Sequence, residues 1–455
     1  MGYLRNDVIE GQALEFLEPG EIKWRNEEIP GMEPKYKRNG LKSKVGIRGQ
    51  DGTGVLIHDD LLARHILCLG SIGSGKSQTL YQIINATRKS ATSNDVFIFF
   101  DAKGDYLEKF YQPGDYVISN EANPPEGTVN WNIYQDIMAT APEKRDETVR
   151  EIATTLFKED IEGSSSPIFA AGARDLFAAI LSSQVRNIET KGETWDNEKL
   201  VSWLRRATDI TVRNLLKEYE DLTWVRNYIH KENSTSSKQS FFMHLYQNIF
   251  NIFSGGFAKS GDFSITEAIK RKQGKAIFLE YDMASGNVLS PVFTLLLDLA
   301  MKDVLGRKES SEQGNIFFIL DEFPLIPKLS YMDNALNFGR SLGVKVIAGI
   351  QNVGQVDHVY GPSLGRSIIS GFGTIFTFRL FDEASRTLVA YRHGRTKKIV
   401  SIGSSNAGKG VIDTLNDGNV IEDWNITNLK IGQCIVSPYN DEPFLFYPLM
   451  YEDTI

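Results

Sequence analysis

Gly70-Ser71-Ile72-Gly73-Ser74-Gly75-Lys76-Ser77 is the stretch of this chain that decides its fold. The octet has the GxxxxGKS pattern of a phosphate-binding loop. An apolar run at residues 66–69 precedes the octet, and residues 78–84 continue with helical character. A strand, a glycine-rich loop and a helix in this order form the context that the pattern requires. The alternative interpretation is a turn of glycines and serines that matches the pattern by chance.

Each residue type in this loop suits phosphate chemistry. Glycines let backbone N–H groups approach phosphate oxygens, and the start of the following helix adds a partial positive charge. We expect Lys76 to reach the β- and γ-phosphates of a nucleotide and Ser77 to bind Mg²⁺. The residues predicted to contact the nucleotide are Gly70, Ser71, Ile72, Gly73, Ser74, Gly75, Lys76, Ser77 and Gln78.

A second motif is the acidic pair Asp321-Glu322, which follows the apolar run 315–320. A continuous apolar run of this length is typical of a central parallel strand that is buried on both faces. The C-terminal end of such a strand meets the crevice in which open α/β sheets bind ligands. Asp321 is therefore predicted to hold the Mg²⁺ shell, and Glu322 to polarise the attacking water. The alternative is a strand that simply meets solvent at two acidic residues.

Composition limits the classes of protein that this chain can belong to. Its 455 residues are enough for two or three domains. A hydrophobic content of 41% and a charged content of 24% are ordinary for a soluble globular protein. Because the net charge is −8, a DNA site would have to be a local basic patch or a pore lining. Cys68 and Cys434 lie in apolar runs, as core residues in a reducing compartment would. The six histidines show no metal-ligand spacing, so no metal other than Mg²⁺ is predicted.

The sequence shows no secretory signal peptide and no run of about 18 apolar residues. We therefore expect neither a membrane span nor a secretory route for the chain as given. A soluble piece of a longer protein would have the same pattern.

Strands and helices are predicted to alternate through residues 59–187 and 273–455. The predicted strands are 96–100, 275–281, 344–350 and 373–378, and the predicted helices are 142–158, 168–187 and 288–305. This alternation indicates an α/β fold, in which helices cover both faces of a mostly parallel sheet.

Two segments depart from this alternation. Residues 1–58 form a polar N-terminal segment with short strands at 45–47 and 55–57, and its basic stretch 35–44 is interpreted as a solvated face. Residues 188–272 show helical periodicity, a loop at 231–238 and no convincing strand. We expect this second segment to be an all-α domain inserted into the α/β domain.

In combination, the motifs resemble those of the type IV coupling proteins, the hexameric ATPases of bacterial conjugation and type IV secretion of the TraD/TraG type. The resemblance spans residues 44 to 440, approximately. The matching elements are His65-Ile66-Leu67 with the phosphate loop, Phe99-Phe100-Asp101-Ala102-Lys103-Gly104-Asp105, Trp131-Asn132, Leu320-Asp321-Glu322-Phe323, Gly339-Arg340-Ser341-Leu342-Gly343, and Gln351-Asn352-Val353-Gly354-Gln355-Val356 with Tyr360-Gly361. The chain departs from the family in lacking N-terminal transmembrane helices and in having Pro324-Leu325-Ile326-Pro327 after the acidic motif.

The resemblance implies a RecA-like P-loop NTPase fold that uses ATP and Mg²⁺. Gln351 ends a predicted strand, where its amide could bond both the γ-phosphate and the attacking water; the alternative is an amide that caps the strand end. By resemblance, Arg340 would complete the site of a neighbouring subunit, as arginine fingers do. Its alternative is a surface arginine on a helix, and its rivals for the role are Arg379, Arg386 and Arg392.

The predicted strand 96–100 is followed by the charged residues Asp101, Lys103 and Asp105. These residues could order Mg²⁺ or face a pore, and Asp101 or Asp105 could replace Glu322 as the base. The alternative is a solvated turn.

The resemblance also implies a function. The chain would be an ATP-dependent translocase that delivers single-stranded DNA, with an attached relaxase, to a type IV secretion channel. The expected partners are DNA, relaxosome proteins, channel components and further copies of the chain in a hexamer. The expected location is the cytoplasm, at the inner membrane through a partner, and the inserted domain would select substrate. Two alternatives remain open: a HerA/FtsK-like motor on duplex DNA, and a receptor whose ATPase only gates the docking of protein cargo.

Overall fold

The computed structural model describes residues 3–24, 45–121, 123–230, 235–282, 286–308, 314–403, 411–439 and 441–454. The chain divides into two compact units. Unit 1 consists of Met1–Asp95, Lys308–Leu325 and Met332–Ile455, and unit 2 consists of Val96–Arg307 and Ile326–Tyr331. The predicted basic face at 35–44 lies outside the described residues, as does 231–234 of the predicted loop.

The main sheet of unit 1 has the strand order β2-β16-β15-β12-β6-β11-β10. Its central strands β12, β6, β11 and β10 are parallel, whereas β15 runs antiparallel to β12 and β16 antiparallel to β15. The bounds are β2 (Glu15–Phe16), β6 (Ile66–Leu69), β10 (Ile316–Leu320), β11 (Val344–Ile350), β12 (Thr374–Thr377), β15 (Cys434–Ser437) and β16 (Phe444–Phe446).

The central strands are buried at every position, and their side chains are apolar on both faces except for Lys345, Thr374 and Thr377. The register aligns their carboxyl ends: Leu69 of β6 lies opposite Ile350 of β11, and Leu320 of β10 lies opposite Ala348. Residues that directly follow β6, β11 and β10 therefore meet at one edge of the sheet.

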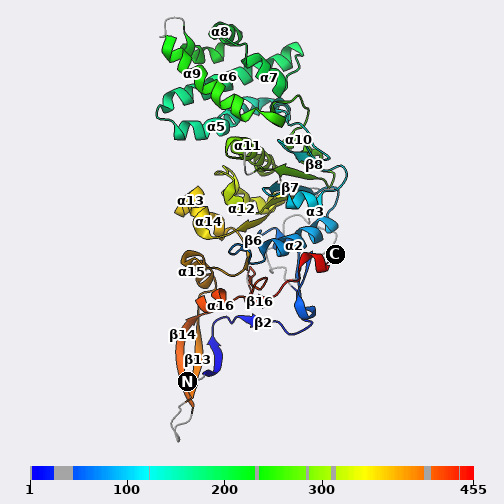
Figure 1. The fold of residues 1–455 in the computed structure, drawn as a ribbon, viewed down its shortest axis with the longest axis vertical. Coiled ribbons are helices and arrows are strands. Elements are labelled where there is room, and N and C mark those ends of the chain that lie inside the picture. Colours follow the sequence, from blue (N-terminus) through cyan, green and yellow to red (C-terminus); the bar gives the residue numbers. More distant parts are fainter. Residues whose placement is uncertain are drawn as a thin grey trace. The chain divides into compact units, whose positions relative to one another are not determined.

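Unit 1 also contains two small sheets (Figure 1). One has the order β3-β5-β4, which confirms the short strands predicted near residues 45–57, and the other has the order β1-β13-β14. Their bounds are β1 (Tyr3–Glu10), β3 (Ile22–Trp24), β4 (Val45–Arg48), β5 (Gly54–Ile57), β13 (Arg395–Gly403) and β14 (Val411–Asn419). The α-helices of unit 1 are α1 (Asp59–Leu62), α2 (Lys76–Ser90), α12 (Met332–Phe338), α13 (Val353–Tyr360), α14 (Pro362–Ser370), α15 (Glu383–Arg392) and α16 (Asp423–Thr427).

Unit 2 has a parallel sheet of order β7-β9-β8 and a group of helices. The strands are β7 (Val96–Asp101), β8 (Tyr116–Ile118) and β9 (Ala276–Glu280). The α-helices are α3 (Asp105–Phe110), α4 (Ile133–Met138), α5 (Arg145–Gly163), α6 (Pro167–Lys191), α7 (Asn197–Leu204), α8 (Asp209–Lys217), α9 (Thr235–Ile252), α10 (Ile265–Arg271) and α11 (Gly286–Leu305). Of these, α5 to α9 gather into one helical body (Figure 1).

Helix α6 is the longest helix of this body and contacts α5, α8 and α9. Among the described residues, it alone has the length and composition to cross a membrane, and 67% of its most apolar 18-residue window is buried. A core helix meets the same criteria. The predicted start of the all-α insertion, residue 188, falls in the last turn of α6, and α5 and α6 pack on helices beyond it. The insertion at 188–272 thus stays a prediction.

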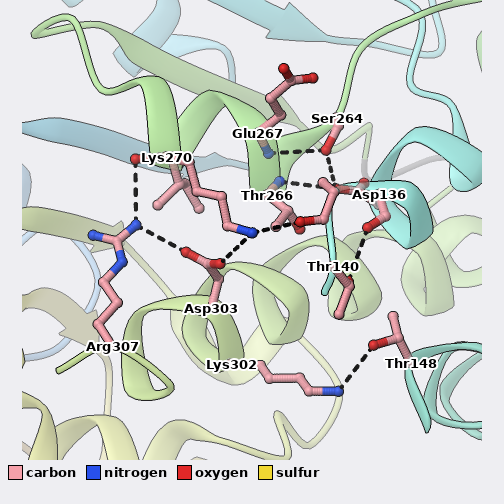
Figure 2. Close-up of polar contacts among 12 residues, drawn as sticks. Asp136, Thr140, Thr148, Ser264, Thr266, Glu267, Lys270, Lys302, Asp303 and Arg307 are labelled. Carbon is pink, nitrogen blue, oxygen red and sulfur yellow. Dashed lines mark hydrogen bonds and ion pairs between the residues drawn. The ribbon is translucent and has the colours of Figure 1, made fainter. Parts of the chain in front are cut away.

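A buried carboxylate, Asp136 on α4, is hydrogen-bonded to the start of α10 in unit 2 (Figure 2). Asp136 accepts hydrogen bonds from Trp131 Nε1 (2.5 Å), Ser264 Oγ (2.6 Å) and the Thr266 N–H (2.9 Å). Burial raises the pKa of Asp136, and these hydrogen bonds oppose that rise. The Asn197 side chain donates to the Trp131 carbonyl at 2.7 Å. Asp136 therefore joins Trp131, which precedes α4, to the start of α10, and Asn197 of α7 is tied to the same point.

Candidate nucleotide site

Three neighbouring strands of unit 1 deliver the predicted catalytic residues to one edge of the sheet. The phosphate loop follows β6, Gln351 follows β11, and Asp321-Glu322 follows β10, in the spatial order β6-β11-β10. This is the edge at which open α/β sheets bind ligands. The structure thus brings Lys76, Gln351 and Glu322 to adjacent strand ends, as the sequence predicts.

The phosphate loop has the backbone shape that its glycines permit. Gly73 and Gly75 have φ values of +71° and +108°, and helix α2 begins directly afterwards at Lys76. A Cβ atom on Gly73 would meet no atom within 4 Å, so this side of the loop is open. A Cβ atom on Gly70 would meet Phe378 Cβ at 2.5 Å and Ser74 Oγ at 2.8 Å. The loop is closely packed at Gly70 and open at Gly73.

The polar groups of the loop suit a phosphate. Lys76 is only 7% exposed, and its ammonium donates to the carbonyls of Gly70 (2.5 Å) and Ser71 (3.2 Å). The Ser74 hydroxyl is buried and has no hydrogen-bond partner within the described chain. A buried cation and an unsatisfied hydroxyl beside positive-φ glycines match the needs of phosphate oxygens. Ser77 follows Lys76 in the first turn of α2, where its hydroxyl could hold Mg²⁺.

The side chains of Ile72 and Gln78, two members of the predicted nucleotide-contact set, are not among the buried polar groups of the phosphate loop. The Ile72 side chain is 80% exposed. Gln78 uses its side chain elsewhere, because its Oε1 accepts a hydrogen bond from the backbone N–H of Tyr451 at 2.8 Å. Any contact of Gln78 with a nucleotide would therefore come from its backbone.

The acidic pair differs in backbone conformation from the strand before it. Asp321 lies against β11, where a Cβ atom on Gly349 would collide with its Oδ1. Glu322 has a φ of +56°, in the left-handed region that a residue with a side chain rarely adopts. It borders a pocket of about 310 Å³ that is also lined by Pro324, Leu325, Asn352, Gly354, Gln355, His358 and Val359.

Gln351 is half-buried at the end of β11, and its N–H approaches Gln355 Oε1 at 3.4 Å. The cap of the following helix α13 is its neighbour Asn352, whose side chain accepts from the Gln355 N–H at 3.0 Å. Asn352 thus caps the helix, and both interpretations of Gln351, nucleotide sensing and an amide that caps the strand end, stay open. The Gln351 side chain remains a candidate for nucleotide sensing.

Arg340 lies at the opposite edge of the same sheet. It belongs to the 3₁₀ helix η6 (Gly339–Leu342), which precedes β11, whereas Gln351 follows β11. Seven residues of strand separate the two edges by about 20 Å. Arg340 therefore does not reach the phosphate loop of its own chain. It lines a cavity of about 800 Å³ together with Arg64, Arg392, His65 and His393.

The three rival arginines are engaged in other contacts. Arg379 Nε donates to the Thr427 carbonyl at 3.1 Å, Arg386 pairs with Asp423 at 2.6 Å, and Arg392 donates to the carbonyls of Phe372 and Gly373. Arg64 stacks on the Tyr439 ring at 3.9 Å. The sequence contains no sign that Arg64 and Arg392 would join Arg340 in one cavity, because the three lie on separate elements.

Asp101 is not available as a catalytic base or Mg²⁺ ligand, and the solvated-turn alternative is wrong for it too. Its carboxylate is 1% exposed and accepts four backbone N–H groups at the start of α3, those of Lys103, Gly104, Tyr106 and Leu107, at 2.8–3.2 Å. Burial raises its pKa, while the four bonds favour the charged form. The residue holds the turn between β7 and α3.

Comparison with known proteins identifies the family. A family model described as the type IV secretion-system coupling protein DNA-binding domain matches residues 52–438, which is most of the chain. The chain belongs to this coupling protein family. The resemblance expected from the motifs is confirmed.

Among curated relatives, the coupling protein TraD of Escherichia coli (strain K12) is 22% identical over 389 residues. The match covers 84% of this chain and 50% of TraD, so the chain spans about half the length of this relative.

Solved structures of coupling proteins share the fold. The conjugative coupling protein TrwBdeltaN70 in its unbound form is 18% identical, with a TM-score of 0.71, and the match covers 99% of this chain and 93% of TrwBdeltaN70. TrwB in complex with ADP and Mg²⁺ is also 18% identical, with a TM-score of 0.68 and coverage of 98% and 94%. The predicted α/β fold, a RecA-like P-loop NTPase with a mostly parallel sheet, is confirmed for this coupling protein.

Proposed function

We propose that this coupling protein is an ATP-dependent motor that moves single-stranded DNA, with an attached relaxase, to a type IV secretion channel. One observation carries the proposal: a phosphate loop, a glutamine and an acidic pair follow three adjacent parallel strands of unit 1. The family description as a DNA-binding domain supports DNA as the substrate. The ADP and Mg²⁺ bound by the structural neighbour TrwB support the choice of ligand.

The residues divide the chemistry among them. Lys76 and the backbone N–H groups of the loop bind the phosphates, Ser77 and Asp321 hold Mg²⁺, and Glu322 takes the proton of the attacking water. Gln351 senses the γ-phosphate. Bound Mg²⁺ supplies positive charge at the phosphate oxygens. The position of Lys76 supports phosphate binding. Its ammonium donates to the carbonyls of Gly70 and Ser71 and could donate to a phosphate oxygen instead.

Arg340 acts between subunits in this proposal. Its distance from the phosphate loop of its own chain, about 20 Å along β11, leaves a neighbouring copy as the site it can complete. We therefore propose a ring-shaped homo-oligomer, a hexamer by family resemblance, with relaxosome and channel proteins as partners. Action at the cytoplasmic face of the inner membrane, through a partner, belongs to the same proposal.

The deciding experiment measures ATP turnover with no DNA, with single-stranded DNA and with duplex DNA, at several protein concentrations. A motor on single strands predicts stimulation mainly by single-stranded DNA. Stimulation only by the duplex would favour a duplex motor, and no stimulation by either would favour a receptor that recruits protein cargo. Lys76→Ala should abolish turnover, and turnover within about threefold of wild type would contradict the motor. Lys89→Ala, an exposed lysine on the same helix α2, is the matched control.

A further inference from the structure

We infer that the turn at residues 430–433, remote in sequence from the phosphate loop, is a positioning element of the nucleotide site. Its Gly432 fixes the conformation of the loop from outside and thereby sets the affinity for the nucleotide. The inference rests on the proposed function, because it assumes that the loop binds a nucleotide.

The turn has a geometry that requires glycine. The Gln433 N–H donates to the Lys430 carbonyl at 3.0 Å, and the Lys430 N–H donates to Gln433 Oε1 at 3.1 Å. Gly432, the third residue of this turn, has a φ of +82°. A positive φ at this position is typical of a type II turn and strongly favours glycine.

Gly432 contacts the phosphate loop backbone to backbone. Its N–H donates to the Ser74 carbonyl at 2.8 Å. A Cβ atom on Gly75 would lie 2.7 Å from Gly432 Cα and 3.1 Å from its nitrogen. Gly75 therefore has no room for a side chain, and a Cβ atom on Gly432 would make a tight contact of 3.2 Å with Tyr447 Cε2.

This contact determines where the loop's N–H groups point. In a trans peptide the C=O and the N–H point in opposite directions. Because Gly432 holds the Ser74 carbonyl on the side of the turn, the Gly75 N–H is directed to the other side of the loop. An N–H already directed in this way can donate a hydrogen bond to an anion without reorganisation of the loop. Such preorganisation raises the affinity for the anion.

Other ties hold the loop and α2 from the same C-terminal region. The Ser71 N–H donates to the Arg379 carbonyl at 3.0 Å, and Arg379 Nε donates to the Thr427 carbonyl at 3.1 Å. Further along, the Tyr451 N–H donates to Gln78 Oε1, and Gln82 Nε2 donates to the Leu449 carbonyl, both at 2.8 Å. The 430–433 turn is thus one of several contacts between this region and the site, and the one that touches the loop centre.

The test compares two substitutions with equal backbone strain. Gly432→Ala places a side chain at φ +82°, and Gly20→Ala does the same at φ +81°, where a Cβ atom would meet nothing within 4 Å. For both variants, isothermal titration calorimetry gives the dissociation constant of ADP from the protein in the presence of Mg²⁺. Differential scanning calorimetry gives the melting temperature. We expect Gly432→Ala to bind ADP at least about tenfold more weakly than Gly20→Ala does, at a temperature well below both melting temperatures.

A second variant separates positioning from folding. Gly432→Asn should bind ADP more tightly than Gly432→Ala does, because asparagine tolerates a positive φ. If Gly432→Ala does not fold, Gly432→Asn takes its place in the comparison with Gly20→Ala. Equal ADP affinity of the Gly432 and Gly20 variants would overturn the inference. Absence of ADP binding by the wild type, or unchanged binding by Lys76→Ala, would instead overturn the proposed function.

Discussion

Glu322 shows how a single residue in this chain combines strain and chemistry. Its φ of +56° costs on the order of 1–3 kcal/mol for a residue with a side chain. The residue is the second after the buried strand β10, so the strained turn sets the direction of its carboxylate. Strain of this kind is retained where surrounding structure and function both require it.

Two substitutions at this residue should separate strain from chemistry. Glu322→Gln keeps the side-chain shape but cannot take a proton, so we expect ATP binding without hydrolysis and little change in stability. Glu322→Gly should also lose hydrolysis but gain about 1 kcal/mol in the free energy of unfolding, because glycine accepts a positive φ. Calorimetric binding and urea unfolding measure both effects. Equal stability of the two variants would show that the backbone is not strained.

His65 is a buried histidine that the fold keeps neutral. Its Nδ1 accepts the Val346 N–H at 3.0 Å, which leaves the proton on Nε2, 3.1 Å from the Leu336 carbonyl. Burial lowers its pKa from 6.5 to about 4, and Lys345 and Arg340 contribute to the same shift. The folded-state pKa thus lies below the unfolded one. The stabilising contribution is complete above pH 6.5 and is lost as the pH falls toward 4.

This residue makes stability dependent on acidity. Between pH 6.5 and 4, one proton accounts for about 1.4 kcal/mol per pH unit, or about 3 kcal/mol in all. The free energy of unfolding, measured with urea from pH 7 to 4.5, should therefore fall less steeply in His65→Asn than in wild type. Identical slopes in His65→Asn and wild type would contradict the assignment.

At the scale of elements, the sequence predicts the central strands well and the peripheral ones poorly. The strand predicted at 344–350 is β11 at those bounds, and that at 96–100 is β7 with one more residue. Long apolar runs between turn residues define such strands locally. The hairpin of β13 and β14 was not predicted, since its polar strands depend on a partner, β1, from the other end of the chain.

The candidate site follows the same division. Lys76, Glu322 and Gln351 could be predicted because each belongs to the turn or loop that follows an apolar run that forms a strand. The role of Asp101 could not, because a carboxylate after a strand has the same appearance whether it binds a ligand or caps a helix. Its four N–H donors come from the turn geometry of α3. The contact of Gly432 with the loop depends on packing between residues far apart in sequence.

The Asp136 network should control the stability of the elements that it joins. Asp136→Asn places an NH₂ group opposite one of three hydrogen-bond donors in a buried site, so we expect a loss of about 2–3 kcal/mol. The free energy of unfolding is measured with urea. Glu267→Gln, on the neighbouring helix α10, should change stability by less than about 0.5 kcal/mol. Equal effects of the two substitutions would remove the network's structural role.

At the scale of the whole molecule, the place of Arg340 predicts how copies of the chain cooperate. If Arg340 completes the site of a neighbour, specific activity rises with protein concentration. A mixture of Arg340→Ala and Lys76→Ala subunits should then regain turnover, because some interfaces pair an intact loop with an intact arginine. Replacing Arg340→Ala in the mixture by Arg366→Ala, an exposed arginine on α14, is the control, since those subunits remain active alone. Mixed subunits without activity would exclude a finger in trans.

The packing of unit 2 also predicts how the helical body can be removed. We propose that residues 145–257, from α5 to the short 3₁₀ helix (Gly255–Ala258) that follows α9, are separable, since helices α5 to α9 pack mainly on one another. Replacing 188–272 by a linker takes away Ser264 and Thr266, the partners of Asp136, and should prevent folding. Replacing 145–257 keeps them and should spare ADP binding while it removes substrate recognition. Retention of ADP binding by the first variant alone would contradict this boundary.

The pairing of β1 with β13 has a consequence for the synthesis of the protein. Tyr3 lies opposite Ile402, so β1 leaves the ribosome almost 400 residues before its partner strand does. At about 5–20 residues per second, that delay lasts tens of seconds. Unit 1 is assembled from three separate segments, whereas almost all of unit 2 comes from one, residues 96–307. Unit 2 can therefore fold on the ribosome before β1 has paired with β13. During that interval the unpaired backbone groups of β1 are exposed to aggregation, and we expect a chaperone to bind this segment.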